Sequence, residues 1–169
     1  MKKNNLKKII INICEQFSSI ILGKGVSIEI EGDISQKITC DADKIGQIIR
    51  NLLSNAIKFS PTGKKIIISI ANGAPPAENR NTEKSSIPVT ILIKIKDEGI
   101  GIPKNELKSI FDKFIQSSRT KTGAGGTGLG LAICQEIINA HNGKIWAENN
   151  LDGGSTFCIM LPYEQETLN

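Results

Sequence analysis

The sequence predicts an α+β fold, a two-layer α/β sandwich in which a mixed, mostly antiparallel sheet carries helices on one face. Two observations lead to this prediction. Three segments with apolar residues at helical spacing are interspersed with strand-like apolar segments. Most strand-like segments also follow one another at hairpin-length separations, which suit antiparallel pairing. With 169 residues, the chain is long enough for one domain with a sizeable core.

The first third of the chain predicts a helix, two strands and a second helix. Residues 4–23 carry apolar residues at helical spacing, and residues 26–31 alternate between apolar and polar as a strand does. A second short strand is predicted at 37–40. The next helix begins after Asp41, a suitable N-cap, and ends before Pro61.

Two further strands are predicted at 64–71 and 88–97. The segment between them, 72–86, is rich in Pro, Asn, Glu and Ser and predicts a long, mobile hairpin loop. In the second strand the residues expected to share one face are Val89, Ile91, Ile93 and Ile95.

The last third predicts a short helix at 103–114 and a polar, glycine-rich segment at 115–128. An apolar helix is predicted at 128–142, followed by two closing strands at 143–149 and 155–162.

Composition excludes several classes of protein. The net charge is only +4, aromatic residues make up 4% and the lysines are scattered, so no nucleic-acid interface is expected. No apolar run reaches the length of about 18 residues that a membrane span needs, and the basic start leads into no cleavage site. No membrane contact is expected of this domain. The cysteines predict reduced, packed thiols in a cytoplasmic protein, and they are Cys14, Cys40, Cys134 and Cys158.

A polar stripe interrupts the predicted helix that follows Asp41. Asn51, Asn55 and Lys58 are spaced so that they lie on one face, opposite the apolar face. Solvated helix faces usually carry better helix formers than asparagine. Asparagine offers a carbonyl oxygen to a hard cation, and lysine offers a positive charge to a phosphate. The stripe alone leaves two interpretations open, a solvated face and the floor of a metal and phosphate site.

Three glycine clusters follow. In the first, Asp97 ends an apolar strand and is followed by Gly99 and Gly101, which indicates either an ordinary strand-end turn or a close approach to a ligand. The second, 123–130, precedes a helix whose first turns carry no acid, an arrangement that favours anion binding. The third, 152–157, is by itself a hairpin turn.

Taken together and in this order, these segments resemble the catalytic and ATP-binding domain of sensor histidine kinases, within the ATPase superfamily shared with DNA gyrase, Hsp90 and MutL. NLLSNAIKF (51–59) is similar to the N box and DEGIGIP (97–103) to the G1 box. IFDKF (110–114), GGTGLGL (125–131) and GGSTF (153–157) are similar to the F box, G2 box and G3 turn. The resemblance covers about residues 25 to 162.

The resemblance implies ATP and Mg²⁺ as ligands. Asn55 would bind Mg²⁺ through its amide oxygen, and Asn51 and Lys58 would line the triphosphate. Asp97 would accept a hydrogen bond from the adenine amine, with Gly101 letting the base approach.

A mobile lid over the nucleotide is also implied, with Phe111 and Phe114 as its anchors. The residues that would close this lid onto the phosphates are Gly126, Gly128, Leu129 and Gly130. The other residues expected to contact the nucleotide are Phe59, Gly99, Ile102, Arg119, Lys121, Thr127, Leu131 and Thr156.

The sequence departs from the family pattern in two places. Many members carry an arginine just after the F box, and here the residue is Gln116. Arg119 or Lys121 in the lid could supply the positive charge, and Arg119 is counted with Asn51 and Lys58 as catalytic. The phosphoacceptor histidine is also missing, because the one histidine, His141, follows the last helix and is expected to be a packed structural residue.

The resemblance therefore implies a domain of a larger kinase. Residues 1–24 are expected to be a linker helix from a dimerisation hairpin that carries the phosphoacceptor histidine, 25–163 the ATP-binding domain and 164–169 a tail. The expected partners are that hairpin and a downstream response regulator. A serine kinase of the anti-sigma type and a nucleotide-binding module without catalysis remain as alternatives. ATP hydrolysis is disfavoured, because the hydrolytic branch has a glutamate where this chain has Asn51, whose amide is no general base.

Overall fold

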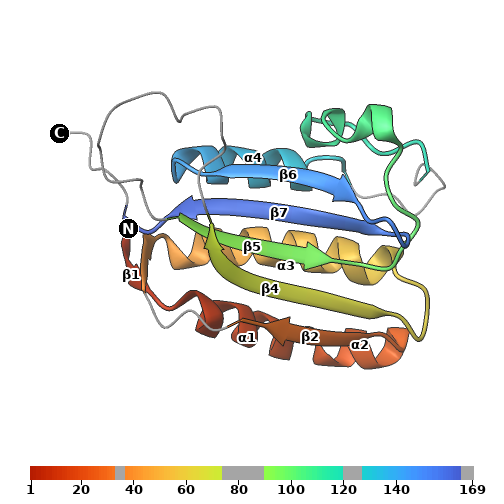
Figure 1. Cartoon of the computed structure of the whole chain (residues 1–169), viewed down its shortest axis with the longest axis horizontal. Helices are drawn as coiled ribbons and strands as arrows, with labels where there is room; N and C mark the ends of the chain where they lie inside the picture. Colours follow the sequence, from red (N-terminus) through yellow and green to blue (C-terminus); the bar gives the residue numbers. More distant parts are fainter. Residues whose placement is uncertain (33–36, 74–89, 120–126, 165–169) are drawn as a thin grey trace.

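The fold is built on a five-stranded sheet (Figure 1). This computed structural model describes residues 1–32, 37–73, 90–119 and 127–164. The strand order is β2 (Ser27–Glu31), β4 (Lys65–Gly73), β5 (Thr90–Lys96), β7 (Ser155–Pro162) and β6 (Lys144–Asn149). The β2–β4 pair is parallel and the other three pairs are antiparallel. The predicted mixed, mostly antiparallel sheet is confirmed.

The helices lie behind the sheet, on one face (Figure 1). They are α1 (Leu6–Gln16), α2 (Ser18–Lys24), α3 (Ala42–Phe59) and α4 (Gly130–Ala140). Their apolar residues and the inward residues of the strands form one continuous core. This arrangement confirms the predicted α+β sandwich. None of the described helices is both long enough and apolar enough to cross a bilayer.

Helix α3 has the features that its sequence predicts. The Oδ1 atom of Asp41 accepts the backbone N–H groups of Asp43 and Lys44, each at 3.1 Å, and so caps the helix. The apolar face is fully buried, and its members include Ile48, Ile49, Leu52 and Leu53. Burial of this face holds the polar stripe on the opposite side.

The N-terminal segment differs from its prediction. The single helix predicted at 4–23 is wrong, because Lys2–Asn4 forms strand β1, which pairs antiparallel with β3 (Ile38–Cys40), and the helix breaks at Phe17. Asn5 caps α1 by accepting the Lys8 N–H at 3.0 Å.

Residues 1–24 also contribute to the core of the domain. Leu6, Ile10 and Ile13 of α1 are buried among the residues that α3 buries. The boundary expected at residue 25 therefore does not coincide with the edge of the core, which extends back to Leu6.

The short helix predicted at 103–114 is also wrong. The segment forms two 3₁₀ turns, Lys104–Glu106 and Ser109–Phe111. Phe114 has a φ of +64° and donates its N–H to the carbonyl of Gly128 at 3.0 Å, so the backbone leaves the right-handed helical region there. The closing strands β6 and β7 agree with the predicted ranges 143–149 and 155–162. Strand β5 buries Ile91, Ile93 and Ile95, as its alternation predicts, whereas Val89, expected on the same face, lies outside the described residues. Most of the loop predicted at 72–86 lies outside the described residues.

Candidate functional site

A cavity of about 310 Å³ opens between α3, the start of α4 and the carboxyl end of β5. This volume lies at the lower end of the range for small-molecule sites. The predicted site residues that line it are Asn51, Asn55, Lys58, Phe59, Asp97, Gly101, Ile102, Thr127, Gly128, Gly130 and Leu131. Residues from three separate segments of the sequence, 51–59, 97–102 and 127–131, therefore meet around one cavity.

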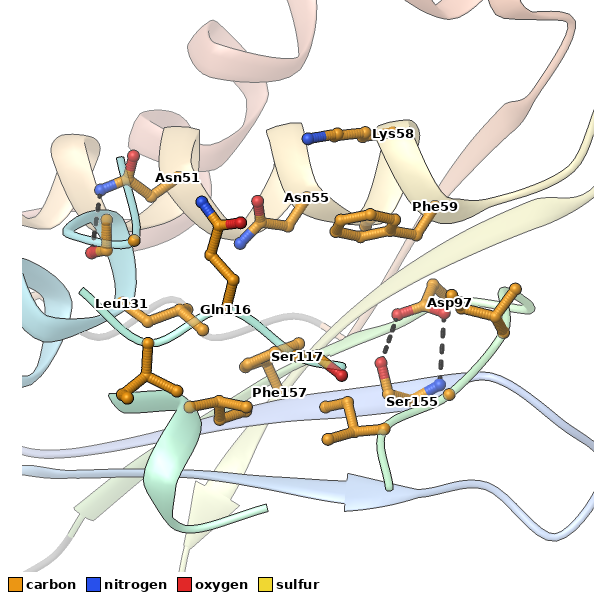
Figure 2. Close-up of a pocket in the computed structure, with 18 of the residues that line it drawn as sticks. Asn51, Asn55, Lys58, Phe59, Asp97, Gln116, Ser117, Leu131, Ser155 and Phe157 are labelled. Carbon is orange, nitrogen blue, oxygen red and sulfur yellow. Dashed lines mark hydrogen bonds between the residues drawn. The ribbon is translucent and has the colours of Figure 1, made fainter. Parts of the chain in front are cut away.

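The polar stripe of α3 forms one wall of this cavity (Figure 2). Asn51 donates from Nδ2 to the carbonyl of Gly130 at 3.4 Å and to Cys134 Sγ at 3.6 Å. Because a carbonyl can only accept, these contacts assign the amide orientation of Asn51. Lys58 is exposed, and its Nζ atom lies 5.2 Å from the centre of the Phe59 ring. The stripe is thus the polar wall of a cavity, not a fully solvated face.

Asp97 lies opposite this wall, buried at the end of β5. Its Oδ1 atom accepts the backbone N–H groups of Gly99 at 2.8 Å and Ser155 at 3.2 Å. Its Oδ2 atom accepts the hydroxyl of Ser155 at 2.8 Å (Figure 2). A carboxylate offers about four lone-pair positions, so Asp97 can accept one more donor from the cavity. The exocyclic amine of a nucleobase is a donor of this kind.

The loop after β5 forms the adjoining wall. Gly101 has a φ of +70°, a conformation that favours glycine. A Cβ atom there would lie 3.1 Å from Asn149 Oδ1 and 3.4 Å from the carbonyl oxygen of Gly154. The glycine is thus required by its backbone and by the packing behind the wall. This reason differs from the close approach of a ligand that the sequence suggests.

The two phenylalanines expected to anchor the lid have different environments. Phe111 is buried and packs edge-on against Phe157, with ring centres 6.2 Å apart. Phe114 is 73% exposed. A Cβ at Gly128, whose φ is +70°, would lie 2.9 Å from the backbone carbon of Phe114, so the two chain segments are in close contact. Packing therefore holds Phe111 in place, while Phe114 is held by the contact of its backbone with Gly128.

Arg119, one of the two residues expected to supply a positive charge to the phosphates, does not line the cavity in this conformation. Arg119 donates from Nη1 to the carbonyl of Ile100 at 2.6 Å. Gln116 lines the cavity, and its side chain extends toward Asn55 (Figure 2). Lys121 and Gly126 lie outside the described residues.

Comparison with known proteins decides the family. The sequence model described as "Histidine kinase-, DNA gyrase B-, and HSP90-like ATPase" matches residues 40–165. The chain belongs to this ATPase family.

Two similar proteins are named as sensor kinases. Sensor histidine kinase WalK of Bacillus subtilis (strain 168) is 41% identical over 130 residues, which are 76% of this chain and 19% of that protein. Sensor protein kinase WalK of Staphylococcus aureus is 43% identical over 126 residues, 73% of this chain and 27% of that protein. The chain thus spans about a fifth to a quarter of the length of these relatives.

Solved structures place the fold among histidine kinase catalytic domains. The nucleotide-free catalytic domain of histidine kinase ThkA superposes with a TM-score of 0.78 at 28% identity, over 98% of this chain and 97% of that one. ThkA in complex with the response regulator TrrA superposes with a TM-score of 0.73 at 24% identity, over 98% of this chain and 42% of that one. The chain therefore contains a histidine kinase-type ATPase domain.

Several residues of this ATPase domain's cavity were not predicted from the sequence. Ser155 binds Asp97, whereas its predicted neighbour Thr156 donates to Asn150 Oδ1 at 2.6 Å. The GGSTF segment (153–157) indicated this region of the cavity, but the residue predicted from it, Thr156, is one position away from Ser155, which binds Asp97. The other unpredicted residues of the lining are Ala56, Ile100, Ile110, Ile115, Gln116, Ser117 and Phe157. The predicted residues that lie outside the lining are Gly99, Phe111, Phe114, Arg119, Leu129 and Thr156.

The cavity also fits a magnesium–nucleotide complex. Mg²⁺ keeps several waters and takes one or two protein oxygen ligands together with substrate phosphates. Asn55 offers one amide oxygen from the polar wall, beside the exposed cation of Lys58. Among the described residues, no cluster of three His, Cys, Asp or Glu side chains offers a closed metal site. A single amide ligand suits a metal that arrives with the phosphates.

Proposed function

We propose that this chain is the ATP-binding catalytic domain of a two-component sensor histidine kinase. It binds Mg²⁺–ATP in the cavity and donates the γ-phosphoryl group to a histidine on a separate helical-hairpin domain of the same kinase. The observation that carries the proposal is the pairing of a buried acceptor, Asp97, with a wall of amides and a lysine on the opposite side of one cavity.

The two ends of the cavity have the chemistry for the two ends of ATP. Asp97 is placed to accept the exocyclic amine of adenine, while Gly101 and Ile102 flank the base. Asn51 and Lys58 line the space for the phosphates, and Thr127, Gly128 and Gly130 lie at the start of α4 beside them. When bound, Mg²⁺ held by Asn55 neutralises charge on the phosphate oxygens.

Transfer to a protein is favoured over hydrolysis. Residue 51 is an asparagine, whose amide has no proton-accepting role at neutral pH. Its nitrogen also donates to Gly130 and Cys134. No general base for water is therefore supplied at this position.

The partners follow from the same proposal. The phosphoacceptor histidine belongs to a dimerisation hairpin of the kinase, and the phosphoryl group then passes to the receiver domain of a response regulator. ThkA, which shares this fold, has been solved in complex with the response regulator TrrA, and a complex of this kind supports a response regulator as the partner proposed for this chain. The domain is proposed to act in the cytoplasm.

Titration calorimetry with Mg²⁺–ATP and Mg²⁺–ADP tests the proposal. One site is expected, with affinity reduced at least tenfold in Asn55→Ala and in Asp97→Ala, a loss of about 1.4 kcal/mol or more. Ser54→Ala, next to Asn55, and Asp112→Ala are controls with the same types of change, because both side chains are exposed and lie outside the cavity lining. Binding that persists unchanged in both cavity variants would disprove this location of the site.

A further inference from the structure

Asn149, the last residue of β6, holds both backbone groups of one residue in the cavity wall. Its Oδ1 atom accepts the N–H of Ile102 at 2.9 Å, and its Nδ2 atom donates to the Ile102 carbonyl at 2.6 Å. The side-chain amide therefore pairs with Ile102 as a neighbouring strand would. These residues are 47 positions apart in the sequence.

The residue held in this way is part of the cavity, whereas Asn149 is not. Ile102 and Gly101 both line the cavity, and Ile102 is buried. Asn149 lies behind Gly101, with its Oδ1 atom 3.1 Å from the position that a Cβ of Gly101 would occupy. Any influence of Asn149 on a ligand must therefore pass through the backbone of Gly101 and Ile102.

The loop has little other side-chain support. Residues 99–103 form neither helix nor strand. Among the residues that the structure describes, the side-chain hydrogen bonds to the backbone of 100–102 come from Asn149 and from Arg119. Arg119 is exposed and lies in a turn, outside any helix or strand. Asn149 extends from a strand of the sheet and is the fixed support.

The neighbouring residue holds the other end of the same wall. Asn150 donates from Nδ2 to the carbonyl of Asp97 at 2.8 Å, and its Oδ1 atom accepts the hydroxyl of Thr156. The two asparagines after β6 thus hold the wall at Asp97, where it begins, and at Ile102. The relative position of these two points sets where a flat base can lie while it donates to Asp97.

We propose that Asn149 is a positioning residue for nucleobase binding, which fixes Gly101 and Ile102 so that adenine can reach Asp97. This inference rests on the proposed function, since it assigns the base end of the same site. The hydrogen bonds of the Asn149 amide go to Ile102 in the wall after β5, whereas the proposed phosphate end lies on α3 and α4. Loss of the Asn149 amide should therefore weaken the contribution of the base and leave that of the phosphates intact.

Calorimetry with two probes separates these contributions. Mg²⁺–ADP carries the base, and Mg²⁺–tripolyphosphate carries phosphates alone. Asn149→Ala should weaken Mg²⁺–ADP about tenfold, as expected for the loss of two hydrogen bonds that position the wall, with tripolyphosphate affinity unchanged. Asn149→Asp keeps an acceptor for the Ile102 N–H but places a second acceptor oxygen against the Ile102 carbonyl, so it should lose at least as much Mg²⁺–ADP affinity as Asn149→Ala. Asn139→Ala, at an exposed asparagine near the other end of the domain, is the control for both.

The outcomes distinguish this inference from the function on which it rests. If the unaltered chain binds neither ADP nor ATP, the proposed function is wrong. If it binds ADP and Asn149→Ala binds ADP equally well, the function stands and the positioning role is wrong. Equal loss for ADP and tripolyphosphate would show a general structural defect and would also overturn the positioning role. Should Asn149→Ala fail to fold, the comparison of Asn149→Asp with the unaltered chain for the same two probes decides.

Discussion

The Nε2 atom of His141 accepts the backbone N–H of Asp41 at 3.1 Å, which joins the end of α4 to the start of α3. The other ring nitrogen, Nδ1, lies 2.8 Å from the carbonyl oxygen of Ile137. Because a backbone N–H can only donate and a carbonyl can only accept, the imidazole is neutral with its proton on Nδ1. His141 is 2% exposed, as its predicted structural role requires. The bond connects the two helices that line the cavity.

Replacing His141 should therefore destabilise the domain. In His141→Ala the Asp41 N–H loses its acceptor, and the free energy of unfolding should fall by about 1–3 kcal/mol. Urea unfolding followed by circular dichroism measures the change. Asn139→Ala, an exposed change on the same helix, should shift the free energy by less than about 0.5 kcal/mol. Equal stability of His141→Ala and the unaltered chain would contradict the structural role.

Acid should weaken the cap of α3. The backbone N–H groups of Lys44 and Asp43 lower the pKa of the Asp41 carboxyl, with the Lys44 bond as the largest cause. A lowered folded-state pKa means that the stabilisation is present above the unfolded value, about 3.9, and is lost as the pH falls through the folded value. Asp41→Asn keeps a capping side chain without this titration. When the pH is lowered from 7 to 3, the free energy of unfolding of the unaltered chain should therefore fall by more than that of Asp41→Asn. A pH-independent difference would refute the assignment.

The two phenylalanines near the lid should differ sharply on truncation. Phe111 is buried against Phe157, so Phe111→Ala should cost about 3–5 kcal/mol. Phe114 is 73% exposed, and Phe114→Ala should cost less than about 0.5 kcal/mol. Thermal or urea unfolding of this pair tests whether packing holds Phe111 and not Phe114. Similar losses for both variants would count against the observed packing.

Thiol reactivity should follow burial. Burial raises the pKa of Cys134 and of Cys158 to about 11, so little thiolate forms at neutral pH. Cys14 is the half-buried cysteine, and the other three are buried. Ellman's reagent at pH 8 should label Cys14 first in the native chain, and Cys14→Ser should remove this fast phase. All four thiols should react together once the chain is unfolded in urea. Fast labelling of Cys134 in the native state would contradict its burial.

Local patterns in the sequence were sufficient to predict the strands of the five-stranded sheet and helix α3. The alternation in β5 and the capped, two-faced pattern of α3 each depend on residues close together in the chain. The predicted helix at 103–114 failed because the segment divides into two 3₁₀ turns and becomes extended at Asp112, and its end is held by the bond from the Phe114 N–H to the carbonyl of Gly128, fourteen residues away. The pattern of the segment itself contains no sign of this contact.

The site was predictable where a side chain comes from a regular element, and not where it depends on distant pairing. Asn55 and Asp97 follow from the α3 stripe and the strand end. The choice between Ser155 and Thr156 depends on how β7 aligns with β5, where Thr156 pairs with Lys96 and Ser155 lies beyond it, beside Asp97. Asn149 gave no signal, because its partner Ile102 is brought to it only by the folded sheet.

The chain by itself should hold ATP without labelling itself. Phosphoryl transfer needs a nucleophile in line with the γ-phosphate. The one histidine of the sequence, His141, is buried with both ring nitrogens in contact with backbone groups. It also follows α4, whose 11 residues separate it from the start of that helix by about 16 Å at 1.5 Å per residue. Incubation with Mg²⁺ and γ-labelled ATP should leave this chain unlabelled, and the histidine hairpin of the same kinase, supplied in trans, should acquire an acid-labile, base-stable phosphate. The hairpin with its histidine replaced by alanine is the control and should stay unlabelled. Labelling of this chain alone, abolished in His141→Ala, would overturn both the proposed transfer in trans and the structural role of His141.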